Sequence, residues 1–507
     1  MGVYVERVHP FGAVDGDPGD VIVDIENDVA HGLTSAHSRA VVLSRVLSRD
    51  RSRPHLVPVA SRVLCACNRF GCGSYSGRPI GRTVPDLAWQ LMSATGTTGG
   101  VSMTEQAGAP AGGPLTGIRV IDLSAVVSGP FGTSILADQG ADVITVEQAH
   151  APDIVRDTGA LVESAQGVSA MWASLNRNKR SIALNLKDQR GKDLVLELIR
   201  DADVVVQNFR PGAIERLGLG WDVLHALNPE LVMCSVSGFG SDGPYSHRPA
   251  FDAIVQSITG YPMVQVDDQG EPQLMATIVA DKVTSLNVAQ AVCAALVARS
   301  MGHGGQHIEI AMVDASIHFL WLEAMWNHTY VDHETDSPDL SAVCKLFRTV
   351  DGWAMVYPLG TDAQWQGLCA ALHRPDLASD ARFAGLHGRI TYGSEINQEL
   401  ELETVKYTTA ALVKLMDDAD VPAAPVNSRE EMIADPHVQH RGIVQESVHP
   451  TAGTIRSARS PALFSKTTSV NSRHAPLFGE HTDEVLSDLL AVSADDLVTL
   501  RSDGVIA

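Results

Sequence analysis

From residue 117 onward, hydrophobic and polar positions follow a repeating pattern that predicts alternating strands and helices. Short apolar runs bounded by small residues indicate strands at residues 117–124, 142–147, 202–209 and 231–240. Between the first two runs, residues 129–141 open with Gly-Pro and end beside Gly140, as a short helix does. Residues 190–202 carry apolar side chains at helical spacing. Strands that alternate with helices predict a parallel sheet, and their near-continuous apolar character predicts a sheet buried on both faces.

The pattern changes along the rest of the chain. Residues 284–300 are apolar and rich in alanine, which is typical of a closely packed helix. Residues 302–326 predict a turn, an alternating strand and another helix, and residues 346–360 predict a hairpin. Near the end of the chain we expect a strand within residues 454–464 and a final helix within residues 475–490.

These elements predict an α/β protein, with a Rossmann-like large domain built on a parallel sheet and a smaller α+β domain. We place the first part of the large domain at residues 113–335, the small domain at 336–435 and a C-terminal segment at 436–507. Residues 1–112 differ, because their positive charges are all arginine and they end in glycine-rich, linker-like sequence. We expect this extension to be disordered, or the protein to start at Met103, with a small separate domain as the alternative.

The charge of the chain narrows the choice of partners. A formal net charge of -22 argues against a general binder of nucleic acid or membrane surfaces, because both are polyanions. Any strongly anionic ligand therefore needs a local group of cations. No apolar run reaches the ~18 residues that span a bilayer, and no basic start followed by an apolar stretch marks a secretory signal. We therefore expect a cytoplasmic protein.

The seven cysteines are scattered along the chain. Cys65, Cys67 and Cys72 lie close together but lack the second ligand pair of a zinc finger, so we expect no metal site there. The other four lie singly in apolar segments, as reduced cysteines of a protein core do: Cys234, Cys293, Cys344 and Cys369.

A glycine motif suggests a nucleotide site that the following residues argue against. Residues 238–243, Gly-Phe-Gly-Ser-Asp-Gly, match the dinucleotide pattern G-x-G-x-x-G and follow a predicted strand. A dinucleotide site also needs a helix to begin here, because its amide groups hold the pyrophosphate. Pro249 lies inside that helix and would break it. We do not expect NAD binding, although a glycine-rich loop at the carboxyl edge of a parallel sheet still suits a ligand.

Seven segments, in order, carry a resemblance to a known family: ADQGADVITVE, NRNKRSIALNLK, ADVVVQNFRPGAIERLGLG, NPELVMCSVSGFGSDGPY, GHGGQHIEIAMVDA, ADPHVQHRGIV and PLFGEHTDEVL. The chain from Pro114 to its end, about four-fifths of its length, resembles the family III CoA-transferases of the CaiB/BaiF type. This group includes formyl-CoA transferase, carnitine CoA-transferase and α-methylacyl-CoA racemase. The resemblance implies acyl-CoA and a carboxylic acid as substrates, with no tightly bound cofactor. It also implies a homodimer of interlocked open rings, with the large domain built from both ends of the chain.

The resemblance places the family nucleophile at Asp281, in the segment MATIVADKVTSLN. A carboxylate that attacks an acyl thioester forms a mixed anhydride, which CoA thiolate then converts to an aspartyl-CoA thioester. These two steps, each easier than a direct exchange, conserve the acyl-transfer potential of the original thioester. The alternative is that Asp281 caps a helix that begins near Thr284. The start of a helix would also keep the carboxylate ionised.

By the same resemblance, loops at the ends of the strands form the CoA site. Backbone groups after the first strand approach the pantetheine, a four-residue strip binds adenine, and arginines meet the phosphates. The corresponding residues are Val127 and Ser128 for pantetheine, Leu184, Asn185, Leu186 and Lys187 for adenine, Asn208, Phe209 and Arg210 in the loop after the third predicted strand, and Arg180 and Arg216 as cations. Each arginine taken alone also fits a solvated surface. Gln148 stands where formyl-CoA transferase has arginine, which puts one phosphate contact in doubt.

Two positions separate the branches of the family, and we include both in the predicted binding site. Racemases need a histidine and an aspartate on opposite faces of the substrate. Here Phe251 occupies the histidine position, followed by Asp252, and phenylalanine cannot carry a proton. We therefore expect a transferase, with a racemase or a non-catalytic CoA-binding scaffold as alternatives. Residues 334–352 lack the tetraglycine loop of formyl-CoA transferase, which predicts an open acyl site for a larger dicarboxylic, branched or aromatic acid.

Overall fold

The computed structural model describes residues 112–507, apart from residues 166, 268, 339–343 and 469–472. Predictions for the N-terminal extension, for Met103 and for the cluster of Cys65, Cys67 and Cys72 lie outside the described residues. The chain divides into two units, residues 1–102 and 103–507, and the fold described here belongs to the second unit.

Six parallel strands form one sheet, in the order β3-β2-β1-β4-β5-β6. Their bounds are β1 (Arg119–Asp122), β2 (Asp142–Gln148), β3 (Arg180–Leu184), β4 (Val204–Gln207), β5 (Val232–Ser237) and β6 (Gln306–Ala311). All five strands predicted for this region are present. β3 was not predicted as a strand, because its run RSIAL is short and follows four polar residues.

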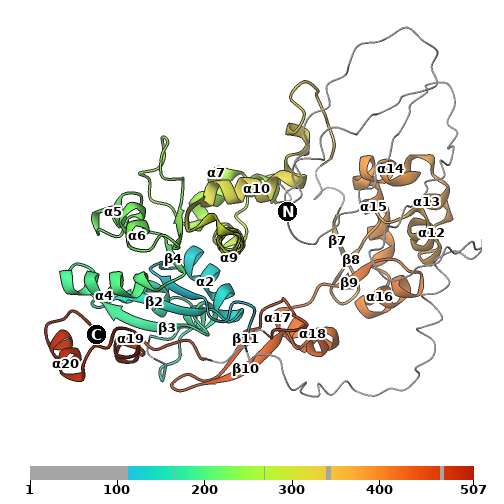
Figure 1. The fold of residues 1–507 in the computed structure, drawn as a ribbon. Coiled ribbons are helices and arrows are strands. Elements are labelled where there is room, and N and C mark those ends of the chain that lie inside the picture. Colours follow the sequence, from blue (N-terminus) through green and yellow to red (C-terminus); the bar gives the residue numbers. More distant parts are fainter. Residues whose placement is uncertain (1–111, 166, 268, 339–343, 469–472) are drawn as a thin grey trace, which may run out of the picture. The chain divides into compact units, whose positions relative to one another are not determined.

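Helices cover both faces of the sheet, as the continuous apolar runs predicted. Val120 faces a core formed with α2, α9 and α10, whereas Ile121 faces a core formed with α4, α6, α19 and α20. Figure 1 shows α2 and α9 on one side of the sheet and α4 and α19 on the other. The bounds of these helices are α2 (Ser128–Asp138), α4 (Gln189–Arg200), α6 (Trp221–Leu227), α9 (Val279–Ala298), α10 (Met312–Ala324), α19 (Thr482–Leu490) and α20 (Ala494–Ser502).

The last residues of the chain complete the sheet beside β3. The amide of Ala507 donates to the carbonyl of Ala183 at 3.1 Å, and the amide of His481 donates to the carbonyl of Ser181 at 2.9 Å. Side chains of α19 and α20 lie in the same core as the strands, and Figure 1 shows the red C-terminal helices next to β3. The helix predicted within residues 475–490 is present as α19, but it is not the final helix, because α20 follows it.

A separate hydrophobic core belongs to the segment that follows residue 344. The predicted hairpin is present as β7 (Leu346–Arg348) and β8 (Trp353–Val356), which pair in antiparallel fashion, and β9 (Ala423–Pro425) pairs with β8. Phe347 and Phe383 are fully buried in this core. The helices of this segment are α12 (Asp362–Ala371), α13 (Pro375–Ser379), α14 (Gly385–Thr391), α15 (Gly393–Thr404) and α16 (Thr409–Asp418).

The strand predicted within residues 454–464 corresponds to β11 (Gly453–Ala458), which pairs with the unpredicted strand β10 (Val444–His449). The remaining helices are short. They are α3 (Ala170–Leu175), α5 (Ala213–Arg216), α7 (Asp252–Thr259), α8 (Tyr261–Val264), α17 (Arg429–Ala434) and α18 (Pro436–Arg441).

Helix α9 and the turn after it, Val279–His303, are long and apolar enough to cross a membrane by length and composition alone. The sequence analysis did not anticipate this, because polar residues interrupt the apolar run. The same profile occurs in core helices of globular proteins, and α9 buries Val288 and Val292 completely in the core beneath the sheet. Leu286 and Val297 on its other face are exposed.

Candidate active site

The candidate site lies where the strand order of the sheet changes direction. β1 is followed in the chain by its neighbour on one side, β2, whereas β4 is followed by its neighbour on the other side, β5. The loops that leave β1 and β4 therefore separate at the carboxyl edge of the sheet, and a crevice forms between them. Ligands of open parallel sheets bind in such a crevice.

The loop after β1 is anchored by a buried ion pair. Asp122, at the end of β1, accepts a hydrogen bond from the ammonium group of Lys179 at 3.0 Å, and both side chains are fully buried. The hydroxyl groups of Ser124 and Thr133 also donate to Asp122. Burial lowers the pKa of Lys179, and the charge of Asp122 opposes that shift. These contacts fix the point at which the chain leaves the sheet.

Val126 in this loop adopts a left-handed conformation, with φ at 67°. A β-branched residue is strained there, and such strain persists only where neighbours impose it. The amide of Val126 donates to Asp153 at 2.9 Å. Asn208, which follows β4, accepts from the amide of Ala125 at 2.9 Å and donates to its carbonyl at 2.6 Å. The loops after β1 and β4 are thereby locked to each other.

Asp281 lies in the first turn of α9, close to a second carboxylate. The helix begins at Val279 rather than near Thr284, and Ile278 occupies the capping position. The alternative, that Asp281 caps this helix, is therefore wrong. Instead, the amide of Asp281 donates to the carboxylate of Asp252 at 3.1 Å. Asp252 is buried, and its other oxygen accepts from the side chain of Gln256.

The charge state of Asp281 also differs from the expectation. Burial, with a smaller contribution from the charge of Asp252, raises the pKa of Asp281 to about 7. The start of α9 therefore does not keep this carboxyl group fully ionised at neutral pH, because desolvation and the neighbouring carboxylate outweigh the helix dipole. Asp281 is half-buried, so it can still reach a ligand.

Asp281 opens into a cavity of about 340 Å³ at the crevice. The cavity brings together Asp281 and five of the residues predicted for CoA binding: Ser128, Asn208, Phe209, Arg210 and Phe251. Its wall also contains residues that the sequence analysis did not propose: Ser237, Ser246, Arg248 and Met312. Asp281 is the one acidic group among the described residues of this wall. The cavity thus combines one carboxyl group, Asp281, with two cationic side chains, Arg210 and Arg248, and none of the three forms an ion pair with a described residue.

The predicted adenine strip, residues 184–187, follows β3 at the same edge of the sheet. The side chain of Gln148 contacts Asn185 at 3.4 Å and accepts from the amide of Leu186 at 3.3 Å. Gln148 therefore positions the strip, although it cannot supply the charge of the arginine in formyl-CoA transferase. Leu184 and Leu186 are buried, and Lys187 is exposed.

Three predicted residues occupy other positions. Val127 is buried and does not line the Asp281 cavity. Arg216 ends the short helix α5, exposed, and forms no ion pair with a described residue. Arg180 begins β3 at the opposite, amino edge of the sheet, where it pairs with Asp142 at 2.6 Å and with Glu484 at 3.3 Å. The structure does not bring Arg180 to the candidate site.

The glycine-rich loop after β5 has no helix before α7. Residues 238–251 are turns and irregular structure, as the position of Pro249 predicted. Gly238 approaches Ala250 so closely that a Cβ atom at Gly238 would lie 2.1 Å from that of Ala250. This close approach folds the loop back on itself and brings residues 246–251 to the wall of the cavity.

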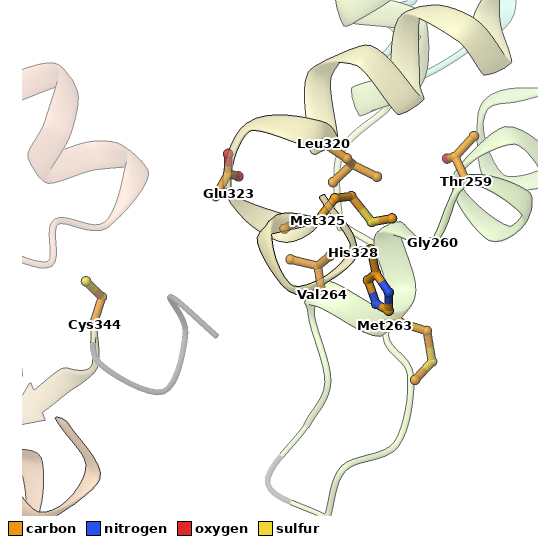
Figure 2. Close-up of a pocket in the computed structure, with 10 residues that line it drawn as sticks. Thr259, Gly260, Met263, Val264, Leu320, Glu323, Met325, His328 and Cys344 are labelled. Atoms are coloured by element: carbon orange, nitrogen blue, oxygen red, sulfur yellow. The ribbon is translucent and has the colours of Figure 1, made fainter. Parts of the chain in front are cut away.

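A second cavity, of about 490 Å³, shares no lining residue with the Asp281 cavity. Figure 2 shows Leu320, Met325 and His328, from α10 and the turn after it, beside the helix α8 that carries Met263. Its walls are mainly apolar, and Met263 is 65% exposed. Its described lining contains one acidic residue, Glu323, and no arginine or lysine.

Comparison with known proteins identifies the family. The sequence profile of CoA-transferase family III matches residues 115–482. A succinate–glutarate CoA-transferase from Agrobacterium fabrum is 36% identical over 387 residues, which are 74% of this chain and 96% of the relative. The succinyl-CoA:glutarate CoA-transferase of Homo sapiens is 30% identical over 403 residues, 78% of this chain and 90% of the relative.

A solved structure agrees with these matches. A CaiB/BaiF family protein from Brucella suis has 30% identity and a TM-score of 0.65, and the match covers 75% of this chain and all of that one. The profile match spans well over half of the chain and includes every segment of the candidate site. The chain therefore belongs to CoA-transferase family III, and it is an enzyme that transfers CoA between acyl-CoA thioesters and carboxylic acids.

Proposed function

We propose that Asp281 carries the acyl group during CoA transfer. Its ionised carboxylate attacks the thioester carbonyl of the donor, CoA thiolate leaves, and a mixed anhydride forms. The thiolate then attacks the aspartyl carbonyl, which releases the donor acid and gives an aspartyl-CoA thioester. The acceptor carboxylate reverses the two steps and frees Asp281. The observation that carries this proposal is the single acidic group, Asp281, in the described wall of the cavity.

The raised pKa of Asp281 suits this chemistry. Nucleophilic strength rises with basicity, so a carboxylate with a pKa of about 7 attacks a thioester more readily than one near 4. About half of the enzyme still holds the reactive, ionised form at neutral pH. No described arginine contributes to the pKa of this group, so its negative charge is not masked by an ion pair.

The arrangement of the loops supports a CoA path along the carboxyl edge of the sheet. Ser128 and Asn208 would hold the pantetheine arm beside Asp281, and the strip at residues 184–187 would hold the adenine two strands away. Arg210 and Arg216, beside the loop after β4, would meet the phosphates. In an acidic chain, these are cations left available for an anionic ligand.

We infer that the acids exchanged are dicarboxylic. Relatives are named for succinate and glutarate, for D-citramalate, for L-malate and for oxalate, which all carry two carboxyl groups; formate, the other acid in the name of the oxalate enzyme, carries one. Racemase chemistry is disfavoured at this site, because Phe251 is 68% exposed at the mouth of the cavity and offers no proton. The enzyme is expected to act in the cytoplasm.

We further infer that the enzyme is a homodimer. Large apolar side chains are exposed along α7, α8, α10 and the turn after it, including Ile254, Met263, Phe319, Leu322 and Val331. Contiguous exposed apolar surface of this kind marks protein interfaces. The cavity in Figure 2 lies within this surface. A second copy of the chain would cover it, in keeping with the interlocked rings that the resemblance implies.

The proposal is tested by trapping the covalent intermediate. After incubation with succinyl-CoA, hydroxylamine should convert Asp281 to a hydroxamate that mass spectrometry of peptides locates, because free carboxylates do not react. Asp281→Asn should lose the label and at least about 10⁴-fold of the transfer rate, since the nucleophile is gone. Asp252→Asn should still form the label at Asp281. A label at Asp252, or undiminished transfer by Asp281→Asn, would refute the proposal.

A further inference from the structure

We propose that Arg248 binds the second carboxylate of a dicarboxylic acid whose first carboxylate reacts at Asp281. The inference rests on the proposed function, because it concerns the acid that exchanges CoA through Asp281. It assigns substrate selection to a residue in the irregular loop between β5 and α7, for which the sequence analysis proposed no role.

The charges around the cavity single out Arg248. Two cations, Arg210 and Arg248, lie in its wall. Arg210 also borders an adjoining cavity of about 350 Å³ together with the acidic residues Glu215 and Asp242, which partly offset its charge. Arg248 forms no ion pair with a described residue, and it does not border that acidic cavity. Its charge is therefore available to an anion inside the Asp281 cavity.

Aromatic contacts hold Arg248 in a fixed orientation. The guanidinium carbon lies 3.7 Å from the centre of the Tyr245 ring, and the amide of Arg248 donates to the carbonyl of Tyr245 at 2.9 Å. Phe239 meets Tyr245 edge-on, with ring centres 5.8 Å apart. Stacking occupies one face of the guanidinium and leaves its N–H edge free. That planar edge matches a carboxylate, with two parallel hydrogen bonds.

The chemistry of transfer explains why a second carboxylate needs this cation. The reacting carboxylate loses its charge when it becomes part of an anhydride or thioester, whereas the distal carboxylate keeps its charge through every step. Much of the remaining wall is apolar, including Val236, Ala250, Phe251 and Met312. A carboxylate enclosed there without a cation would be strongly disfavoured. A monocarboxylic acid of equal length has no such charge and gains nothing from Arg248.

The experiment compares glutaryl-CoA with pentanoyl-CoA, which has the same number of acyl carbons and no distal carboxylate. In Arg248→Gln, kcat/KM for hydroxamate formation from glutaryl-CoA should fall ten- to hundredfold, the size of a lost charge-assisted hydrogen bond. The value for pentanoyl-CoA should stay within about twofold of that of the wild-type enzyme. The surface variant Arg200→Gln should change neither, because Arg200 pairs with Glu197 on the exposed face of α4.

Binding measurements give a second readout that does not depend on turnover. In the unreactive Asp281→Asn background, adding Arg248→Gln should weaken glutaryl-CoA ten- to hundredfold and leave the Kd of CoA unchanged. Equal weakening of glutaryl-CoA and CoA would mean that Arg248 meets a CoA phosphate, and would overturn the inference. Equal affinity for glutaryl-CoA with and without Arg248 would also overturn it.

Variants at the stacked ring test how Arg248 is positioned. Tyr245→Phe keeps the ring and should keep the preference for glutaryl-CoA, whereas Tyr245→Ala should reduce that preference several-fold. Unchanged preference in Tyr245→Ala would remove the positioning role from Tyr245. A label on Asp281 with unchanged preference in Arg248→Gln refutes this inference alone, whereas no label on Asp281 of the wild-type enzyme refutes the proposed function.

Discussion

Charged side chains at the amino edge of the parallel sheet are paired, whereas several of those around the crevice at its carboxyl edge are not. At the amino edge, Arg119 and Arg180 both pair with Asp142, and Arg299 pairs with Asp203 at 2.7 Å. These side chains are partly buried, and their charges are paired where the strands begin. The amino edge therefore joins strands and helices by electrostatic contacts that need no ligand.

Around the crevice at the carboxyl edge, by contrast, several charges have no partner among the described residues, although Asp122 at the end of β1 pairs with Lys179. Arg210, Arg216 and Arg248 form no ion pair with a described residue, and the pKa of Asp281 is raised by burial and by Asp252 with no opposing cation. The three arginines are exposed and solvated, whereas an ionised Asp281, which is half-buried, is unfavourable for folding. The role of each arginine in this protein therefore follows from its partners. An arginine in an ion pair stabilises the fold, whereas an unpaired arginine is available to bind a ligand.

The largest test of this contrast is the pH dependence of the reaction. Only ionised Asp281 attacks, so kcat/KM should fall about tenfold per pH unit below the pKa of about 7, and by about 100-fold at pH 5 relative to pH 8. Asp252→Asn removes one of the two causes of the raised pKa, and its profile should shift to lower pH. A profile that is flat between pH 5 and 8 would show that no group of this kind limits the rate.

The second test compares alanine variants of two arginines, one at each edge of the sheet. Arg216→Ala should weaken CoA binding ten- to hundredfold, measured by calorimetry, with little change in Tm, because it removes a charge-assisted phosphate contact. Arg180→Ala should lower the free energy of unfolding by about 1 kcal/mol and leave the affinity for CoA unchanged, because it breaks a pair in which Arg180 is buried and Asp142 is partly exposed. The contrast between the two edges fails if Arg180→Ala weakens CoA binding while Arg216→Ala does not.

The smallest expected effect is on the stability of the fold, which the ionised carboxylate of Asp281 lowers. The folded protein holds the pKa of Asp281 above its ordinary value, so ionisation destabilises the fold, fully above about pH 7 and not at all below about pH 4. Asp281→Asn should therefore raise Tm by about 3 °C at pH 8 and leave it unchanged at pH 4. Scanning calorimetry at both pH values measures this. An equal change at both pH values would trace the effect to packing rather than charge.

Apolar periodicity was enough to predict most of the sheet, because strands buried on both faces carry long hydrophobic runs. It missed β3, β9 and β10, whose runs are short or exposed on one side. Arg180 was misplaced for a geometric reason. A five-residue strand spans roughly 13 Å, so its first residue and the strip after its last lie at opposite edges of the sheet despite their closeness in sequence.

Only part of the candidate site could be predicted from the sequence. Ser128, Asn208 and Asp281 could be placed because they follow recognisable strands or lie in family motifs. The pKa of Asp281 depends on burial and, to a smaller extent, on Asp252, which is 29 residues away in the chain and meets it through the packing of α7 on α9. Arg248 lies in a segment without periodicity, and only the close approach of Gly238 and Ala250 brings it to the cavity.

The carboxylate of Asp252 beneath Asp281 has a consequence for the energy of the intermediates. Two negative charges repel each other in the resting enzyme, whereas an acylated or thioesterified Asp281 is neutral and removes that repulsion. In the proposed mechanism, the free ionised enzyme is raised in energy relative to both covalent states. The first attack on the donor thioester is therefore less uphill, and the final release of Asp281 is correspondingly more uphill. Asp252 would thus repel Asp281 whenever Asp281 is free and ionised, and this repulsion would be absent whenever Asp281 carries an acyl group or CoA.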